Sequence, residues 1–247
     1  MKINTHASTA AILLSCSTFA VQGALVAEFT FEEGSGTVAV DSSGNSLDGT
    51  IAGGATWVAG YQGTALNLGG VDGTVRLADA TFATNPTVTS LSAWVLGGAS
   101  NPARSTFFWG AGNLDGTGRQ MQVHLPWENG TTYWRAPGGQ IAVTAGVDSG
   151  TWNHWAFTKD STDGDIKIYL NGAEVASGTG ASTTSVAASW LGSQAGSERF
   201  YDGAIDEVRV YDHELSLGEV QVLAGVPEPS SALLAFVGLA LGLRRRR

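Results

Sequence analysis

Short runs of alternating hydrophobic and polar residues fill the chain between residues 25 and 211. In the run 166–170, three aliphatic residues alternate with Lys167 and Tyr169, which is the period of a strand with one buried face. The Asn171-Gly172 pair that follows is typical of a two-residue type I′ hairpin. Because no segment of about 10 to 15 residues between the runs has a helical period, the pattern predicts an all-β protein.

Twelve runs are predicted as strands: 25–31, 65–68, 74–77, 90–96, 106–109, 120–125, 131–135, 153–158, 166–170, 174–177, 188–191 and 203–211. Many short strands separated by Gly, Asn, Asp and Ser favour a two-sheet antiparallel β-sandwich. We see neither an internal repeat nor an interior linker. The sequence therefore predicts one sandwich domain over residues 25–225.

The first 24 residues have the composition of a secretory signal peptide. Lys2 precedes an apolar stretch, and the small residues Gly23 and Ala24 close it. A buried first helix is the alternative, but the stretch has no amphipathic face. We expect a signal helix over 1–24 and cleavage after Gly23 or Ala24.

The last 22 residues, 226–247, combine a proline motif, an apolar segment over 232–243 and a basic end. The motif and the basic end are Pro227, Glu228, Pro229, Arg244, Arg245, Arg246 and Arg247. The apolar segment is shorter than the roughly 20 residues of a stable membrane span, and the arginines favour the cytoplasmic side. The order of these features resembles the PEP-CTERM sorting signal of Gram-negative bacteria.

That resemblance implies recognition by an exosortase, a membrane enzyme that cuts near the Pro-Glu-Pro motif. It also implies a transient contact with the inner membrane and a final place in the cell envelope, at the surface or in the extracellular matrix of a Gram-negative bacterium. A plain tail anchor is the alternative.

Charge limits the possible partners of the predicted domain. Residues 25–225 contain 8 Lys and Arg against 21 Asp and Glu, so their net charge is 8 − 21 = −13. Nucleic acid, which needs a basic face, is therefore not an expected partner, whereas a divalent cation is. The only cysteine, Cys16, lies in the predicted leader, so the domain has no disulfide.

Five blocks in order resemble LamG-like jelly-roll domains of the concanavalin A-like lectin/glucanase superfamily. They lie at 29–50, 63–68, 91–95, 152–172 and 201–211, and include the motifs Trp152-Asn153-His154-Trp155 and Ile205-Asp206-Glu207-Val208. The resemblance implies two stacked antiparallel sheets in a jelly roll. It also implies that calcium is common and that sugar binding is frequent without being universal.

Catalysis is not expected. β-Glucanases of this superfamily have a Glu-x-Asp-x-x-Glu strand motif, whereas this chain has only the partial patterns Asp163-x-Asp165 and Asp212-x-Glu214. The histidines outside the leader, His124, His154 and His213, are too dispersed for a zinc motif. We expect His154, beside Trp155, to be a packed or hydrogen-bonded sheet residue.

Calcium is the better chemical hypothesis. Asp206 interrupts an apolar strand, where a carboxylate is costly unless it is paired or binds a cation. The family resemblance implies a structural Ca²⁺ held by Asp206, Gly63 and Glu28. Alternatively, Asp206 pairs with Arg209 or caps a turn.

A second oxygen-rich loop contains Asp41, Asn45 and Asp48. The same residues are also what an Asx-turn contains, so both interpretations stay open.

A sugar site needs an exposed aromatic ring beside polar groups, and the segment 125–135 offers one. We name Trp127, Tyr133, Trp134 and Arg135 as candidate ligand-binding residues. The segment is predicted to form a hairpin that turns at Asn129-Gly130. Because side chains alternate along a strand, either Trp134 or the Tyr133 and Arg135 pair is exposed.

These inferences favour an exported, non-catalytic sandwich, stabilised by calcium, that binds glycan, extracellular polymer or protein at the cell surface. A structural matrix protein without a sugar ligand and a glycoside hydrolase are the alternatives.

Overall fold

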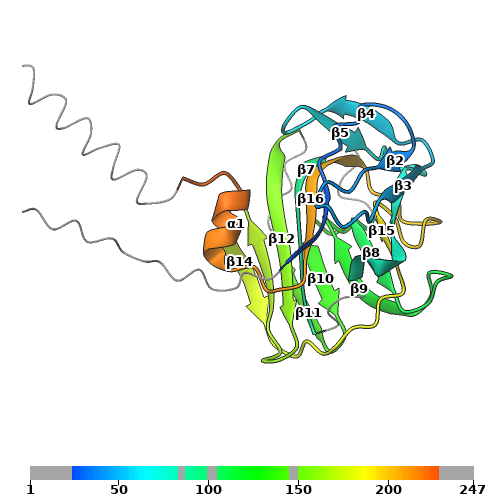
Figure 1. Cartoon of the computed structure of the whole chain (residues 1–247). Helices are drawn as coiled ribbons and strands as arrows, with labels where there is room; N and C mark the ends of the chain where they lie inside the picture. Colours follow the sequence, from blue (N-terminus) through cyan, green and yellow to red (C-terminus); the bar gives the residue numbers. More distant parts are fainter. Residues whose placement is uncertain (1–23, 83–86, 99–104, 145–149, 228–247) are drawn as a thin grey trace, which may run out of the picture.

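The computed structural model describes residues 24–82, 87–98, 105–144 and 150–227. Over these residues two eight-stranded antiparallel sheets pack face to face (Figure 1). The predicted all-β antiparallel sandwich is confirmed. The predicted signal helix and the C-terminal hydrophobic helix lie outside the described residues. Among the described residues, no helix is long and apolar enough to cross a membrane.

Sheet A contains the three longest strands of the described residues, β7 (Val88–Gly97), β12 (Trp152–Asp160) and β16 (Gly203–Tyr211). Its strands, in spatial order, are β14 (Ala173–Gly178), β13 (Ile166–Leu170), β12, β7, β16, β5 (Thr64–Asn67) and β4 (Thr56–Ala59), with β1 (Leu25–Phe29) paired to β16. The pairing of β12 with β7 runs without interruption from Trp152↔Leu96 to Asp160↔Val88. This central pair therefore fixes the register of the sheet.

Sheet B faces sheet A across the core. Its strands, in spatial order, are β11 (Gly139–Val143), β10 (Thr132–Ala136), β9 (Arg119–His124), β8 (Phe108–Ala111), β15 (Ala188–Leu191), β6 (Thr74–Leu77), β3 (Gly49–Ala52) and β2 (Val38–Ala39). A short 3-10 helix, η1 (Asp79–Phe82), follows β6, and one α-helix, α1 (Leu217–Leu223), follows β16.

Each of the twelve predicted runs coincides with a strand, and four further strands, β2, β3, β4 and β11, are present. These four are short and contain mainly Gly, Ala, Thr and Val. Their pairing to longer neighbours, rather than a strong pattern of their own, makes them strands.

The turn after β13 has the predicted type I′ form. Asn171 and Gly172 both have positive φ, 49° and 82°, and Leu170 pairs with Ala173 across the two-residue loop. This geometry matches the right-handed twist of the flanking strands.

The α-helix α1 was not predicted, although its start has a sequence signature. Ser216 and Glu219 form a capping box: the side chain of each residue accepts a hydrogen bond from the backbone N–H of the other. Val220 of α1 and the preceding Leu215 are buried against Ala156 of β12 and Tyr169 of β13. Figure 1 shows α1 against sheet A, on the side away from sheet B.

Trp134 lies in the core and not on the surface. Its side chain is 1% exposed, its ring centroid is 5.9 Å from that of Phe157 on sheet A, and its Nε1–H donates to the Thr158 carbonyl at 2.8 Å. The assignment of Trp134 as a ligand-binding residue is therefore wrong. Of the two predicted alternatives, the Tyr133 and Arg135 pair faces outward.

Replacing Trp134 by Ala should lower the free energy of unfolding by about 3–5 kcal/mol, because it leaves a cavity between the sheets and a carbonyl without its donor. Urea denaturation measures this change. Tyr133→Ala, on the opposite face of the same strand, is the matched control and should cost less than about 1 kcal/mol. Equal stability of the two variants would contradict the placement of Trp134 in the core.

Candidate functional site

The outer face of sheet A is covered by the protein's own residues. Helix α1 packs over Ala156 and Tyr169. Farther along the sheet, the Tyr61 ring stacks on Trp94 at 3.5 Å with an angle of 9° between planes, and the Trp94 ring lies 5.5 Å from His154. These contacts occupy part of the outer face of sheet A, where the side chains of Lys167 and Arg209 remain partly exposed.

His154 is 1% exposed, and neither of its ring nitrogens has a hydrogen-bond partner. Burial, with a smaller contribution from the Arg209 charge, lowers its pKa to about 3. The expected packed sheet residue is confirmed, without the hydrogen bond.

A row of register-paired residues crosses the outer face of sheet B. Arg76, Trp190, Trp109, Gln122 and Arg135 are consecutive cross-strand neighbours from β6 to β10. Neighbouring strands lie about 4.8 Å apart, so the row is about 19 Å long. It presents indole, amide and guanidinium groups on one face, while the alternate residues of the same strands fill the core.

The part of this row on β15 and β8 is closed. Trp109 and Trp190 are 7% and 8% exposed, and Trp109 Nε1–H donates to the Gly116 carbonyl at 3.1 Å. The Arg76 guanidinium lies 4.5 Å from the centroid of the Trp190 ring. These two indoles are therefore packed parts of the face.

The β9–β10 end is open and aromatic. Trp127 and Tyr133 are both partly exposed, and their rings lie 4.2 Å and 6.4 Å from the buried His124 ring between them. The hairpin that holds them turns at Asn129-Gly130, as predicted, with Gly130 at φ 74° and the Gly130 N–H donating to the Trp127 carbonyl at 2.8 Å.

Two arginines border these rings. The Arg135 guanidinium lies 5.4 Å from the Tyr133 ring centroid, and that of Arg199 lies 5.6 Å from the Trp127 ring centroid, both within cation–π range. Arg199 has a positive φ of 55°, a conformation that costs energy for a side chain other than glycine. Its carbonyl accepts from Thr106 N–H at 2.7 Å, which helps to hold it there. We call His124, Trp127, Tyr133, Arg135 and Arg199 the hairpin cluster.

His124 is neutral at physiological pH. Burial lowers its pKa to about 4; a hydrogen bond to the Ser105 backbone opposes this shift, and the charges of Arg135, Arg199 and Arg119 add to it. Its Nδ1 lies 2.6 Å from the Ser105 carbonyl oxygen, which can only accept. Nδ1 therefore carries the proton.

The structure thus brings together three of the four predicted ligand-binding residues, Trp127, Tyr133 and Arg135. Sequence reasoning missed His124 and Arg199. Strand alternation could have placed His124 on the face of Tyr133, its register partner. Arg199 comes from the loop between β15 and β16, and no pattern in the sequence connects it with the hairpin.

The predicted calcium residues lie in two places. Asp206 is fully buried, and its carboxylate accepts from Gln62 N–H at 3.1 Å and Glu207 N–H at 2.8 Å. Gly63 belongs to the same turn, since Gly60 N–H donates to its carbonyl. Glu28 is elsewhere: its carboxylate accepts from Arg209 Nε at 2.7 Å, and its carbonyl accepts from Ser42 N–H at 2.9 Å.

Oxygen atoms converge beside Gly60. A Cβ placed there would lie 2.3 Å from the Gln62 carbonyl oxygen, 2.6 Å from the Thr64 carbonyl oxygen and 2.7 Å from Asp206 Oδ2. We call these three oxygens the oxygen cradle. The Glu32 carboxylate borders the same turn and accepts from Thr64 N–H at 3.2 Å.

The oxygen cradle is mainly backbone, and within the described ranges no three His, Cys, Asp or Glu side chains form a metal-binding group. Burial raises the Asp206 pKa to about 6, against the hydrogen bonds from Gln62 and Glu207. Arg209 pairs with Glu28 and Glu207 and not with Asp206. Of the two predicted alternatives for Asp206, the contacts therefore agree with a carboxylate that caps a turn.

The second predicted oxygen-rich loop has the contacts of an Asx-type turn. Asp41 accepts from the N–H groups of Glu28, Ser43 and Leu47 at 2.9–3.0 Å, and Asp48 accepts from Asp41 N–H at 2.8 Å. Burial raises the Asp41 pKa, but these hydrogen bonds outweigh it and hold the pKa below its ordinary value.

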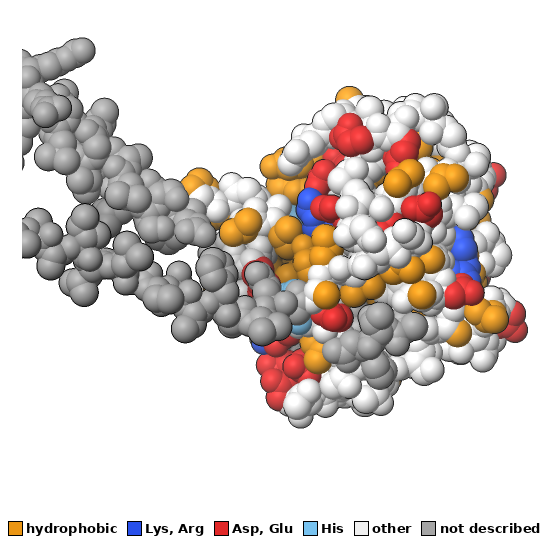
Figure 2. All heavy atoms as spheres, in the orientation of Figure 1, with side chains coloured by type: hydrophobic (Ala, Val, Ile, Leu, Met, Phe, Trp, Pro, Cys, Tyr) orange, Lys and Arg blue, Asp and Glu red, His pale blue; other side chains and the backbone are white. Residues whose placement is uncertain are grey.

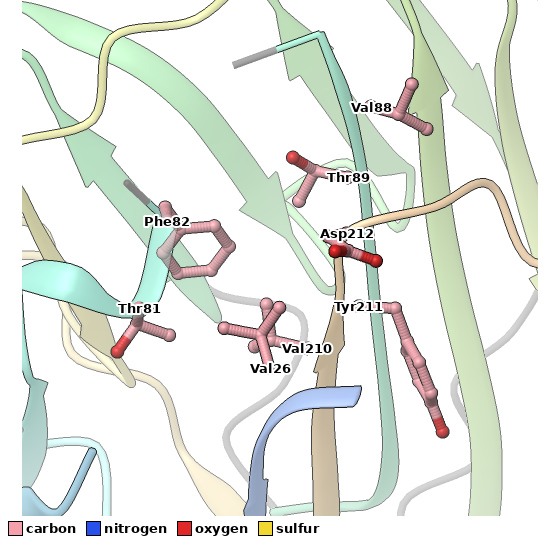
Figure 3. Close-up of a pocket in the computed structure, with 8 residues that line it drawn as sticks. All are labelled: Val26, Thr81, Phe82, Val88, Thr89, Val210, Tyr211 and Asp212. Carbon is pink, nitrogen blue, oxygen red and sulfur yellow. The ribbon is translucent and has the colours of Figure 1, made fainter. Parts of the chain in front are cut away.

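A crevice between β1, η1, β7 and β16 is filled by its own side chains. Figure 3 shows Phe82, Val26 and Val210 pointing toward one another there. It leaves no room for a water molecule, so it is not a ligand site.

The two-sheet sandwich with an aromatic outer face defines a concanavalin A-like protein. Residues 68–221 match Laminin_G_3, described as the concanavalin A-like lectin/glucanases superfamily, and the chain belongs to this family. No curated protein matches the sequence.

Among solved structures, domain 4 of AbnA, a GH43 extracellular arabinanase from Geobacillus stearothermophilus in complex with arabinotriose, is similar over 82% of this chain and 98% of that one. The identity is 27% and the TM-score 0.65. The receptor-binding domain of botulinum neurotoxin C/D mosaic serotype has 12% identity and a TM-score of 0.64, covering 82% of this chain and 51% of that one. A Trypanosoma rangeli sialidase has 17% identity and a TM-score of 0.64, covering 81% and 32%. The chain thus spans about half of the toxin domain and a third of the sialidase, and both show the fold alone.

Proposed function

We propose that this protein is a non-catalytic glycan-binding sandwich and that the glycan lies on the hairpin cluster. The observation that carries the proposal is the pair of partly exposed rings, Trp127 and Tyr133, with Arg135 and Arg199 beside them on the outer face of sheet B. Binding sites typically combine aromatic surface with a few placed polar groups.

The arabinanase domain supports the ligand class. It is similar over nearly its whole length and was solved with arabinotriose bound, so an oligosaccharide ligand is compatible with this sandwich.

The chemistry of the row supports binding without hydrolysis. Its five members are two arginines, two tryptophans and a glutamine, whereas most glycoside hydrolases need two carboxyl groups flanking the scissile bond. His124, with a pKa of about 4, is a poor general acid at neutral pH.

Trp127→Ala and Tyr133→Ala should each weaken glycan binding at least about tenfold, because each removes an aromatic contact surface. A glycan array selects the ligand, with arabinotriose included, and calorimetry gives the Kd for each variant. Tyr61→Ala removes an exposed aromatic ring from the other sheet and should leave the Kd unchanged.

Two results would contradict the proposal. An array without any bound glycan would favour a structural matrix protein, and release of reducing sugar from a bound polymer would favour a hydrolase.

We further propose that Ca²⁺ binds at the oxygen cradle. Two backbone carbonyls and a carboxylate converge at the cradle, and Ca²⁺ binds oxygen ligands of both kinds. Among the described residues Asp206 is a buried carboxylate without a cationic side-chain partner. Asp206, the Gln62 and Thr64 carbonyls and Glu32 would hold the ion, which would neutralise the buried charge and fasten the turn to β16.

Calcium should raise the melting temperature relative to chelator, and the increase should be larger at pH 7.5 than at pH 5. Asp206 has a pKa of about 6 in the folded protein, raised from 3.8, so it must lose its proton to ligate the ion. Without calcium the pH trend is opposite. The folded state binds the Asp206 proton more tightly than the unfolded state does, so the free energy of unfolding rises as the pH falls from about 7 toward 4. Scanning calorimetry of the wild type and Asp206→Ala tests both trends, which the variant should lack. If calcium still raised the melting temperature of Asp206→Ala, the ion would bind at a site that does not include Asp206.

We also propose that the protein is exported and sorted through its C-terminal segment. Pro227 is the last described residue and is exposed just beyond α1, whereas Glu228, Pro229 and Arg244 to Arg247 lie outside the described residues. An exposed, extended stretch of this kind would be open to a processing enzyme.

Mature protein from the native host should end between residues 226 and 230. Replacing Arg244 to Arg247 by Ser should alter sorting and leave the melting temperature unchanged, because these residues follow the sandwich. Intact-mass analysis of the surface or released form decides the matter. A species that still carries the four arginines would make the segment an ordinary anchor.

A further inference from the structure

Three arginines gather at the hairpin cluster without a carboxylate partner. Arg119, at the start of β9, and Arg199 both act electrostatically on Arg135, and all three act on His124. Among the described residues no carboxylate forms an ion pair with any of them. Of the four other described Lys and Arg residues, three are ion-paired, and the fourth, Lys159, donates to the Thr87 carbonyl at 2.6 Å.

The basic residues Arg76, Lys167 and Arg209 each contact at least one acid: Asp79 for Arg76, Asp165 and Glu214 for Lys167, and Glu28 and Glu207 for Arg209. In a domain with 21 acids against 8 basic residues, paired cations are the ordinary outcome. Figure 2 shows carboxylates distributed over much of one face of the molecule. Three unpaired arginines at one aromatic surface therefore need a separate explanation.

Holding like charges close together costs free energy unless a counter-charge is present. Burial and the charges of Arg119 and Arg199 lower the pKa of Arg135. The Arg135 Nε is also buried without a hydrogen-bond acceptor, and a buried unsatisfied donor is costly. Glu128 is the only acid between residues 119 and 136, and it is exposed in the hairpin turn. Among the described residues no carboxylate pairs with Arg135 or Arg199, so their guanidinium N–H groups can donate to an anion of a ligand.

Resting on the proposed function, we propose that the glycan is an acidic polysaccharide, whose carboxylate or sulfate groups pair with Arg135 and Arg199 while its sugar rings lie on Trp127 and Tyr133. Arg119 is exposed on the neighbouring strand β9 and adds positive charge to this surface. The planar guanidinium fork suits bidentate pairing with either group.

The test measures binding of the full-length protein to immobilised polygalacturonate, dextran sulfate and neutral dextran. We expect at least about tenfold tighter binding to one of the acidic polymers than to dextran, weakening as NaCl rises from about 50 to 500 mM. The two acidic polymers distinguish carboxylate from sulfate. Arg135→Gln and Arg199→Gln should each weaken acidic binding at least about tenfold.

Lys167→Gln is the matched control, because it changes the net charge equally but lies on sheet A in an ion pair with Glu214. It should bind like the wild type once its melting temperature shows that it is folded. Trp127→Ala, measured in parallel, reports on the aromatic surface itself.

The outcomes separate the two proposals. Neutral glycan bound through Trp127, with no effect of the arginine variants, would overturn the acidic ligand and keep glycan binding. No binding to any glycan would overturn both. Single-stranded DNA bound as tightly as the acidic polymer at about 150 mM salt, or equal losses in Lys167→Gln, would show unspecific charge attraction and overturn the inference.

Discussion

The burial of Trp134 between the two sheets determines which face of β10 meets solvent. Its indole N–H donates to the Thr158 carbonyl of sheet A, and its ring packs beside Phe157, so the contact joins the sheets as well as filling the core. A slip of one residue would move Tyr133 and Arg135 into the core and lose this bond. Because Trp134 is buried in the core, the neighbouring side chains of Tyr133 and Arg135 face outward and form part of the hairpin cluster.

The two sheets differ in which parts of their outer faces are covered. On sheet A, α1 and the Tyr61 turn bury Tyr169, Trp94 and His154. On sheet B, the loops close over Trp109 and Trp190 and leave the β9–β10 end open. The open surface is small, but it joins partly exposed aromatic rings to unpaired guanidinium groups, a combination that suits an extended ligand with both apolar faces and polar or charged edges.

Charged side chains also differ in whether they have a partner within the chain. Arg76, Lys167 and Arg209 are in ion pairs with nearby acids. The Asp41 carboxylate accepts hydrogen bonds from backbone N–H groups that organise its loop. Asp206 is different, because burial raises its pKa and no basic side chain compensates it. The arginines of the hairpin cluster are the complementary case, with positive charge and no acid. Each of these two places gains free energy if a counter-ion arrives from outside the chain.

The sequence by itself determined the fold class, because two-residue alternation and turn residues are local signals: all twelve predicted runs are strands, and Asn171-Gly172 turns as expected. It narrowed the candidate surface to one hairpin but left open whether Trp134 or Tyr133 and Arg135 face out, since alternation says only that they oppose one another. Packing against Phe157 decided that question. Only the tertiary structure brought Arg199 to Trp127 and the Gln62 and Thr64 carbonyls to Asp206, because these contacts join segments far apart in the chain, where no periodicity connects them.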